Sequence, residues 1–372
     1  MNTMFRSCIA FFKKETVLCI AGLLAVCSAF FVPPSPEYLE YLDLRVLALL
    51  FCLMLVVAGL QSIGVFQALG TSLLSGTRTT RHLILMLTGL CFFSSMLITN
   101  DVALITFVPF AIMVLRMAGL ENLLIPVIVL QTLAANLGSM FTPIGNPQNL
   151  YLYSAFAIPA AKFLLTMLPL TLLSLLLLIA AAWRLPNTGL SIQSMESPAL
   201  LSKGRLTVYL CLFLVCLACV AHLITFPWML LIVGICIYII DRSLFRHADY
   251  FLLLTFVCFF LFIGNMERIP AVSGFFHHLI DQRELLLGIL LSQCISNVPA
   301  AILLSGFTQE WRPLLYGVNI GGLGTLIASL ASLISYRYYT NIDGARKGKY
   351  FRTFTIYNVI FLLIMGAAGC LL

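Results

Sequence analysis

The chain has 372 residues, of which 61% are hydrophobic and only 9% are charged, and its mean hydropathy is +1.06. A water-soluble protein of this length could not bury so much apolar surface, so the composition excludes a soluble enzyme or binding module and predicts a polytopic all-α membrane protein. The net charge of +7 comes from basic residues in short loops. No basic cluster with interleaved aromatic residues is present, which argues against nucleic-acid binding.

Apolar runs of about twenty residues mark the expected spans, and their basic flanks orient them. The first span ends at Pro33-Pro34, and an external loop completes an N-terminal unit, residues 1–45. A second span is expected from Val46 to about Ala68. The N-terminus is placed in the cytoplasm by three basic residues, Arg6, Lys13 and Lys14.

A polar linker over residues 185–205 is the long break between apolar segments, and we expect it in the cytoplasm. It separates a first half, residues 46–184, from a second half, residues 206–372. Roughly nine to eleven transmembrane segments result from counting apolar runs in this way. The expected location is the cytoplasmic (inner) membrane, with the lipid bilayer as the surroundings.

Two apolar runs are interrupted near their centres and are expected to form re-entrant hairpins. The run at residues 83–115 has basic residues at both flanks, so it should enter and leave from the cytoplasmic side. The run at residues 285–306 has acidic flanks, so it should open to the outside. The two hairpins therefore have opposite orientations.

The stretch Asn136–Asn149 should break a membrane helix. Pro143 and Pro147 remove backbone donors and disfavour helix before them, and Gly138 and Gly145 add conformational freedom. Polar residues at membrane depth are costly unless they face protein or a watery cavity. Broken membrane helices of this kind are typical of transporter binding sites.

Both polar segments recur in the second half with the same spacing. The hairpin residues Ser95, Thr99 and Asn100 match Ser292, Ser296 and Asn297. The helix-break residues Asn136, Gly138 and Thr142 match Asn319, Gly321 and Thr325. Two ordered matches, with hairpins of opposite orientation, predict an inverted repeat with two re-entrant hairpins and two broken helices. Small polar residues are also common where membrane helices pack, but packing alone does not explain a shared order.

These segments resemble the ion-transporter superfamily, which contains citrate/dicarboxylate carriers, arsenite permeases and NhaD-type sodium/proton antiporters. The resemblance rests on four motifs: Thr99-Asn100-Asp101, Gly145-Asn146-Pro147-Gln148-Asn149, Ser296-Asn297-Val298-Pro299 and Gly324–Ser332. It implies a homodimeric carrier in which a scaffold supports a moving transport unit. It also implies that sodium and substrate bind at the hairpin tips and helix breaks.

The resemblance assigns roles to particular residues. A first cation site is implied at Ser95, Thr99, Asn100 and the backbone of Gly145, and a second at Ser292, Ser296, Asn297 and the backbone of Ala328. The implied substrate-facing residues are Thr99, Asn100, Asp101, Asn146, Asn149, Asn297 and Ser332. Asp101 and Val298 depart from the dicarboxylate branch, and the run from Gly324 to Ser332 is more similar to the arsenite-permease side.

Asp101 is the acid expected inside the membrane within these motifs. A charge there costs about 2.5–3.5 kcal/mol on insertion scales, so it should be paired, protonated or bound to a cation. One interpretation is proton or cation coupling. The other is a structural cap, since an Asp at a helix start accepts backbone N–H groups.

The function predicted from these features is secondary-active transport of a small inorganic or organic anion or oxyanion, coupled to sodium or protons. The motif segments contain no Lys or Arg, so helix ends, amides and co-bound cations would have to meet the charge of an anion. The alternative is a sodium/proton antiporter, which Asp101 favours. No HExxH, Gly-x-Ser-x-Gly or Walker motif is present, so neither an enzyme nor an ATP-driven pump is predicted. The expected ligands besides substrate are sodium ions or protons, with no other cofactor or metal.

Overall fold

The computed structural model describes residues 15–74, 77–190 and 202–372, and within these ranges the regular structure is helical. The basic N-terminal residues behind the predicted orientation, and most of the predicted linker, lie outside the described residues. In the described part, eight helices are long and apolar enough to cross a membrane, and three further apolar helices are shorter. The prediction of a polytopic all-α protein is confirmed.

The N-terminal region forms α2 (Thr16–Phe31), η1 (Pro36–Leu39), α3 (Leu44–Ser62) and α4 (Val65–Leu74). The Asp43 side chain caps α3 by accepting the Val46 amide at 2.9 Å. Gly64 has a φ of +77°, a left-handed conformation that glycine adopts without strain, and it separates α3 from α4. The single span predicted from Val46 to about Ala68 is therefore two helices.

The first half continues with the hairpin helices α5 (Thr80–Ser94) and α6 (Asn100–Met117), the short η2 (Glu121–Leu123), and then α7 (Leu124–Ser139), α8 (Pro147–Ala155) and α9 (Ala160–Trp183). Helix α7 packs against both arms of the hairpin and against α9. It is buried along almost its whole length, because every residue from Leu124 to Ser139 except the partly buried Pro126 is shielded by neighbouring helices.

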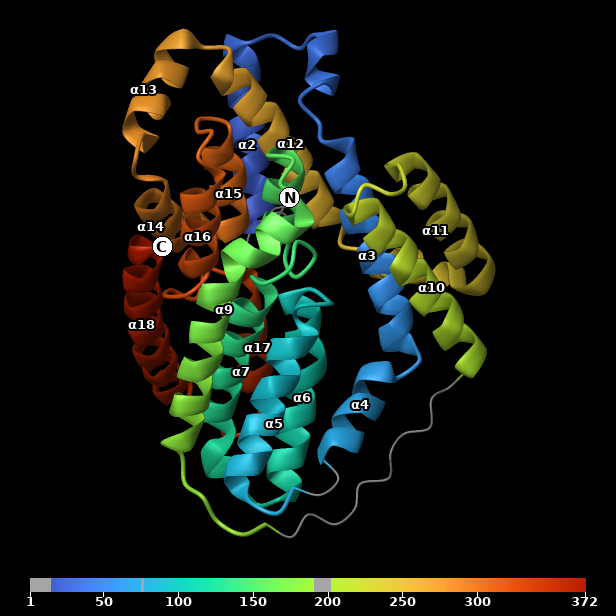
Figure 1. Ribbon diagram of the computed structural model, residues 1–372, viewed down its shortest axis with the longest axis vertical. Coiled ribbons are helices and arrows are strands. Elements are labelled where there is room, and N and C mark those ends of the chain that lie inside the picture. Colours follow the sequence, from blue (N-terminus) through green and yellow to red (C-terminus); the bar gives the residue numbers. More distant parts are fainter. Residues whose placement is uncertain (1–14, 75–76, 191–201) are drawn as a thin grey trace, which may run out of the picture.

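The second half begins with α10 (Lys203–Val220), α11 (Phe226–Asp241), η3 (Arg242–His247) and α12 (Tyr250–Glu267). It continues with α13 (Pro270–Ile280), the hairpin helices α14 (Glu284–Ile295) and α15 (Asn297–Ser305), and then α16 (Trp311–Gly321), α17 (Leu330–Thr340) and α18 (Lys347–Leu371). Helix α13 was not expected from the sequence. It precedes the second hairpin at the upper end of the molecule in Figure 1.

The two hairpins occupy opposite ends of the molecule (Figure 1). The α5–α6 hairpin fills the lower end and the α14–α15 hairpin lies towards the upper end, so that both tips point towards the middle. This arrangement agrees with the opposite orientations expected from the flanking charges. The position of each hairpin relative to a bilayer remains a prediction.

Polar and apolar residues are distributed inside out compared with a soluble protein. Leu214, Ile235 and Leu363 are exposed, whereas asparagines of the repeat, such as Asn136 and Asn319, are buried. Buried polar groups require partners, and lipid tails provide none. The distribution places the hydrogen-bonding groups in the centre of the fold and leaves apolar side chains for the bilayer.

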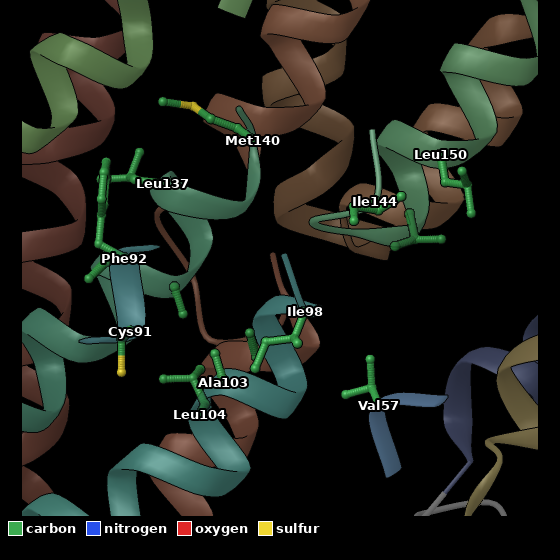
Figure 2. Close-up of a cluster of buried hydrophobic side chains, with 14 of the residues drawn as sticks. Val57, Cys91, Phe92, Ile98, Ala103, Leu104, Leu137, Met140, Ile144 and Leu150 are labelled. Carbon is green, nitrogen blue, oxygen red and sulfur yellow. The ribbon is translucent and has the colours of Figure 1, made fainter. Parts of the chain in front are cut away.

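Hydrophobic side chains surround the first hairpin tip and helix break (Figure 2). Ile98 and Leu104 come from the hairpin, Leu137 from the end of α7, and Ile144 from the break. All four are buried. This packing surrounds the polar tip with apolar side chains, so its buried polar groups need partners within the protein.

Candidate functional site

The first helix break comprises residues 140–146. Helix α7 continues to Ser139, so Asn136 and Gly138 lie in its last turn. The break therefore begins a few residues later than the predicted start at Asn136. Pro147 is the first residue of α8, where its missing N–H leaves nothing unpaired. The predicted break residues that fall inside the irregular segment are Thr142, Pro143, Gly145 and Asn146.

The second helix break comprises residues 322–329. Asn319 and Gly321 close α16, and Thr325 lies within the irregular segment. Each predicted residue therefore has the same structural position as its counterpart in the first half: the Asn and first Gly end a helix, and the Thr follows it. The sequence match thus corresponds to a structural match.

Each hairpin tip is joined to the break of its own half by an equivalent backbone hydrogen bond. The Asn100 amide donates to the Gly145 carbonyl at 3.0 Å, and the Asn297 amide donates to the Ala328 carbonyl at 2.9 Å. The four residues were predicted as cation ligands. The structure brings them together in pairs, one pair in each half, which we call the tip–break junctions.

A threonine supports each junction. The Thr142 hydroxyl donates to the Met96 carbonyl, and the Thr325 hydroxyl donates to the Gln293 carbonyl at 3.2 Å. Gln293 also donates from Nε2 to the carbonyls of Gly321 and Leu323, both at 2.9 Å. The sequence analysis missed Gln293, although it directly follows the repeat residue Ser292.

Glycine allows the hairpin and the broken helix to approach closely. A Cβ at Gly138 would lie 2.6 Å from Ser95 Oγ, and a Cβ at Gly321 would lie 2.6 Å from Ser292 Oγ. Both serines were predicted as cation ligands. Each therefore packs directly against the glycine that ends the broken helix of its own half.

Asn319 ties the second half to the break of the first half. Its Nδ2 donates to Asn149 Oδ1 at 2.7 Å, and its Oδ1 accepts Asn146 Nδ2 at 3.2 Å. Asn149 Nδ2 in turn faces three break carbonyls, those of Ser139, Met140 and Thr142, at 3.1–3.3 Å. The amide side chains thereby satisfy carbonyls that the broken helix leaves free.

Asn136 makes the reciprocal contacts to the second half. Its Oδ1 accepts Ser329 Oγ at 3.0 Å and Asn100 Nδ2 at 3.1 Å, and its Nδ2 donates to Ser332 Oγ at 3.5 Å. Ser329 and Ser332 occupy the repeat positions of Asn146 and Asn149. The two breaks are thus bound to each other crosswise, as a two-fold related pair requires.

A cavity of about 550 Å³ lies beside the first tip, between α3 and α6. Thr99 and Asp101, two of the predicted substrate-facing residues, line it from the hairpin. The other predicted substrate residues, Asn100, Asn146, Asn149, Asn297 and Ser332, are buried and do not line this cavity. In Figure 2, Val57 of α3 faces Ile98 and Leu150, and all three residues line the cavity.

The opposite wall of the cavity carries polar groups that the sequence analysis did not assign to a site. These are Gln61 of α3, His247 at the end of η3, and Asp249, the N-cap of α12. The packing of η3 and α12 against α3 brings His247 and Asp249 to the cavity, so a linear pattern gave no signal for them.

Asp101 lies in the first turn of α6 and lines this cavity. Its Oδ1 atom is buried and has no hydrogen-bond partner among the described residues. The backbone N–H of Asp101 donates to Asn100 Oδ1 at 3.0 Å, so the Asn100 side chain provides the capping contact at this position. The cap interpretation of Asp101 therefore lacks support at Oδ1, and a buried carboxylate oxygen without a partner can accept a proton or cation.

The two tips differ in backbone conformation. Ser296 has φ +75° and ψ 155°, a region that is almost restricted to glycine, whereas Thr99 has φ −63° and ψ 151°. Strained backbone of this kind persists where the surroundings impose it and is often found at functional sites. The second tip therefore stores backbone strain at a predicted cation ligand.

The ligand chemistry at the junctions is that of neutral oxygen. The first junction joins the Asn100 amide to the Gly145 carbonyl, and Ser95 Oγ lies against Gly138. Hydroxyl, amide and carbonyl oxygens of this kind suit a hard cation such as sodium. Among the described residues there is no group of three or more His, Cys, Asp or Glu that could hold a metal ion. Sodium as the only metal stays a prediction.

Comparison with known proteins now adds to the geometry. The sequence model described as "Citrate transporter" matches residues 8–310. The chain belongs to the citrate transporter family. Membership in this family makes it a membrane transporter and not an enzyme, in agreement with the prediction.

Several relatives in other organisms support this assignment. An uncharacterized transporter of Methanocaldococcus jannaschii is 31% identical over 334 residues, covering 89% of this chain and 90% of the relative. The inner membrane protein YbiR of Escherichia coli is 32% identical over 362 residues, covering 94% and 93%. The silicon efflux transporter LSI3 of rice is 33% identical over 160 residues, covering 42% of this chain and 32% of LSI3.

Proposed function

We propose that this protein is a secondary-active transporter that moves a small anion or oxyanion across the cytoplasmic membrane by alternating access, coupled to sodium or protons. The observation that carries the proposal is the pair of equivalent tip–break junctions, at Asn100–Gly145 and Asn297–Ala328. Helix starts at the tips supply positive dipole ends, and the breaks supply carbonyls that point out of the helical hydrogen-bond pattern. The positive helix ends suit an anion, and the carbonyl oxygens suit a cation.

The charge around the cavity supports coupling to a cation. Among the described residues that line it there is no Lys or Arg, while Asp101 and Asp249 both contribute carboxylates. An anion would be repelled from such a cavity unless a cation or proton entered with it. Sodium at the first tip–break junction, or a proton on Asp101, would supply the missing positive charge.

Alternating access is supported by a second cavity at the other end of α8. This cavity, of about 340 Å³, is lined by Glu40, Glu267 and Ser305, among others. Along α8, Leu150 lines the first cavity and the next residue, Tyr151, lines the second. The two cavities therefore approach each other across a single helix.

Aromatic side chains fill the space between these cavities. The ring of Tyr151 lies 5.6 Å from that of Phe260 and 6.4 Å from that of Phe256, measured between ring centroids. On α12, Leu252 lines the first cavity, Phe256 is fully buried, and Phe260 lines the second. We infer that this aromatic barrier closes one side of the membrane while the other side is open.

The proposal extends to the surroundings of the protein. The E. coli relative is named an inner membrane protein, which supports the cytoplasmic membrane as the location. The homodimer, the cytoplasmic N-terminus and the re-entrant position of both hairpins belong to the same proposal. Crosslinking in membranes and cysteine labelling from each side test these points.

Transport by the purified protein in liposomes tests the function directly. Radiolabelled oxyanions and carboxylates are offered with an imposed sodium gradient, an imposed proton gradient, or neither. We expect at least one anion to accumulate only when a gradient is present. Accumulation that ignores both gradients, or single-channel conductance, would contradict secondary-active transport.

A sodium/proton antiporter is the second candidate, because Asp101 and Asp249 line the same cavity and Asp101 Oδ1 has no hydrogen-bond partner among the described residues. Two carboxylates beside a passage can exchange a proton for a cation without any anion. A pH-sensitive dye inside the liposomes separates the candidates. Sodium-driven proton movement in the absence of any anion would favour the antiporter.

A further inference from the structure

An apolar groove runs along the outer face of the first hairpin, between α5 and α9. It has a volume of about 310 Å³ and is lined by Leu85, Gly89 and Phe93 of α5 and by Leu175, Leu178 and Ile179 of α9. Its lining offers almost no polar surface. Leu85 and Gly89, one turn apart, lie on one face of α5, so the groove follows the helix axis.

The groove is deep because of Gly89. A Cβ built at this position would meet no atom within 4 Å, so nothing in the protein occupies the space above the glycine. Both helices are apolar, and α9 is long enough to span a membrane. The surrounding medium for this face is therefore hydrocarbon, and a flexible chain is the natural filling for a narrow apolar groove.

One end of the groove carries positive charge. Arg81 lies one turn before Leu85 on α5, and Arg184 directly follows α9. The Arg81 guanidinium stacks 4.8 Å above the Trp183 ring and donates to the Trp183 carbonyl at 3.2 Å, which fixes it at the groove end. Neither arginine pairs with a carboxylate of the described chain, and Arg81 Nε is buried without a hydrogen-bond partner there.

We propose that this groove binds an anionic glycerophospholipid. One acyl chain lies between α5 and α9 over Gly89, and the headgroup phosphate contacts Arg81 and Arg184. Arginine guanidinium groups recognise phosphate oxygens with paired donors, and Trp at this depth marks the membrane interface. The charge of the groove end selects an acidic over a zwitterionic headgroup, because a zwitterion brings no net negative charge.

Native mass spectrometry of the purified full chain tests the site. The protein is titrated with dioleoyl phosphatidylglycerol or with dioleoyl phosphatidylcholine, which share acyl chains and differ in headgroup charge. We expect the wild type to retain phosphatidylglycerol preferentially. Equal retention of the two lipids would overturn the proposal, because the basic groove end would then select nothing.

Two variants probe the two parts of the site. Gly89→Leu fills the groove without a clash and should weaken phosphatidylglycerol retention roughly tenfold, because the acyl chain loses its place. Arg184→Gln changes an exposed side chain and should weaken retention roughly fivefold by removing one basic group.

Matched controls come from elsewhere on the surface. Gly234→Leu places the same side chain on α11, where a Cβ also meets nothing within 4 Å, and Arg205→Gln removes an exposed charge from α10. Both should retain the lipid like the wild type. Wild-type retention by Gly89→Leu, or an equal loss in the controls, would overturn the proposed position. Each variant is first shown to be monodisperse with unchanged melting temperature.

Discussion

The two halves of the repeat share their geometry but not their chemistry. Both have a tip amide bound to a break carbonyl, a glycine packed against a serine, and a threonine that bridges tip and break. The third tip position, however, is Asp101 in the first half and Val298 in the second, and the break position of Gly145 is Ala328 in the second half. Backbone and glycine contacts fix the shape of a junction, so its side chains are free to differ. The two halves of the repeat can therefore have different roles in binding and coupling.

The largest effect is expected from Asp101→Asn, which removes the titratable group but keeps the size of the side chain. Gradient-driven uptake in liposomes should fall to background while insertion and purification are unchanged. Val298→Thr, the matched change in the other half, should retain most uptake. Full uptake by Asp101→Asn with unaltered sodium and pH dependence would show that the halves do not differ in coupling.

Gly145→Ala should be the most destabilising change at a junction. A Cβ there would lie 2.1 Å from the Ser139 carbonyl oxygen, and such overpacking costs about 1–3 kcal/mol or more. The reverse change in the second half, Ala328→Gly, should cost only about 0.5–1 kcal/mol through backbone entropy. Thermal unfolding in detergent measures both. Equal losses would mean that the two breaks are packed alike.

The crosswise asparagine contacts should also be unequal. A double-mutant cycle of Asn319→Ala with Asn149→Ala should give a coupling of about 1 kcal/mol, because these groups lie 2.7 Å apart. The equivalent cycle of Asn136→Ala with Ser332→Ala should give less, since that contact is 3.5 Å long. Reversible unfolding titrations supply the free energies. A larger coupling in the second cycle would reverse the comparison.

The smallest effect concerns the strained second tip. Ser296→Gly should raise stability by up to about 1 kcal/mol, because relief of the strain at φ +75° exceeds the entropy cost of glycine. Thr99→Gly, at an ordinary conformation, should lower stability by a similar amount. Sodium-dependent protection from unfolding should weaken in Ser296→Gly if its hydroxyl binds the ion. A stability loss in both variants would remove the proposed asymmetry of the tips.

Much of the fold could be predicted because membrane insertion leaves few options. Apolar length located most of the long helices, and flanking charge predicted two hairpins of opposite orientation, which lie at opposite ends of the molecule. The repeat spacing paired Asn100 with Asn297 and Gly145 with Ala328, and the structure joins these residues as two junctions. The break boundaries were less accurate, because Asn136 and Gly138 remain helical and Pro147 begins a helix instead of ending one.

The walls of the site could not be predicted, because they depend on contacts between segments far apart in the chain. His247 and Asp249 end and begin ordinary helices, and nothing in their local sequence marks a cavity. The crosswise partners of Asn136 and Asn319 also required the fold. A pattern within one half cannot reveal that its polar groups are satisfied by the other half.

The crosswise contacts have a consequence for biosynthesis. The Asn136 amide leaves the ribosome long before Ser329 and Ser332 are made, and Asn146 and Asn149 likewise precede Asn319. Until the last sixth of the chain is inserted, the first break holds polar groups in the membrane without their final partners. The nascent first half therefore completes the hydrogen bonds of its own helix break only when the C-terminal helices arrive.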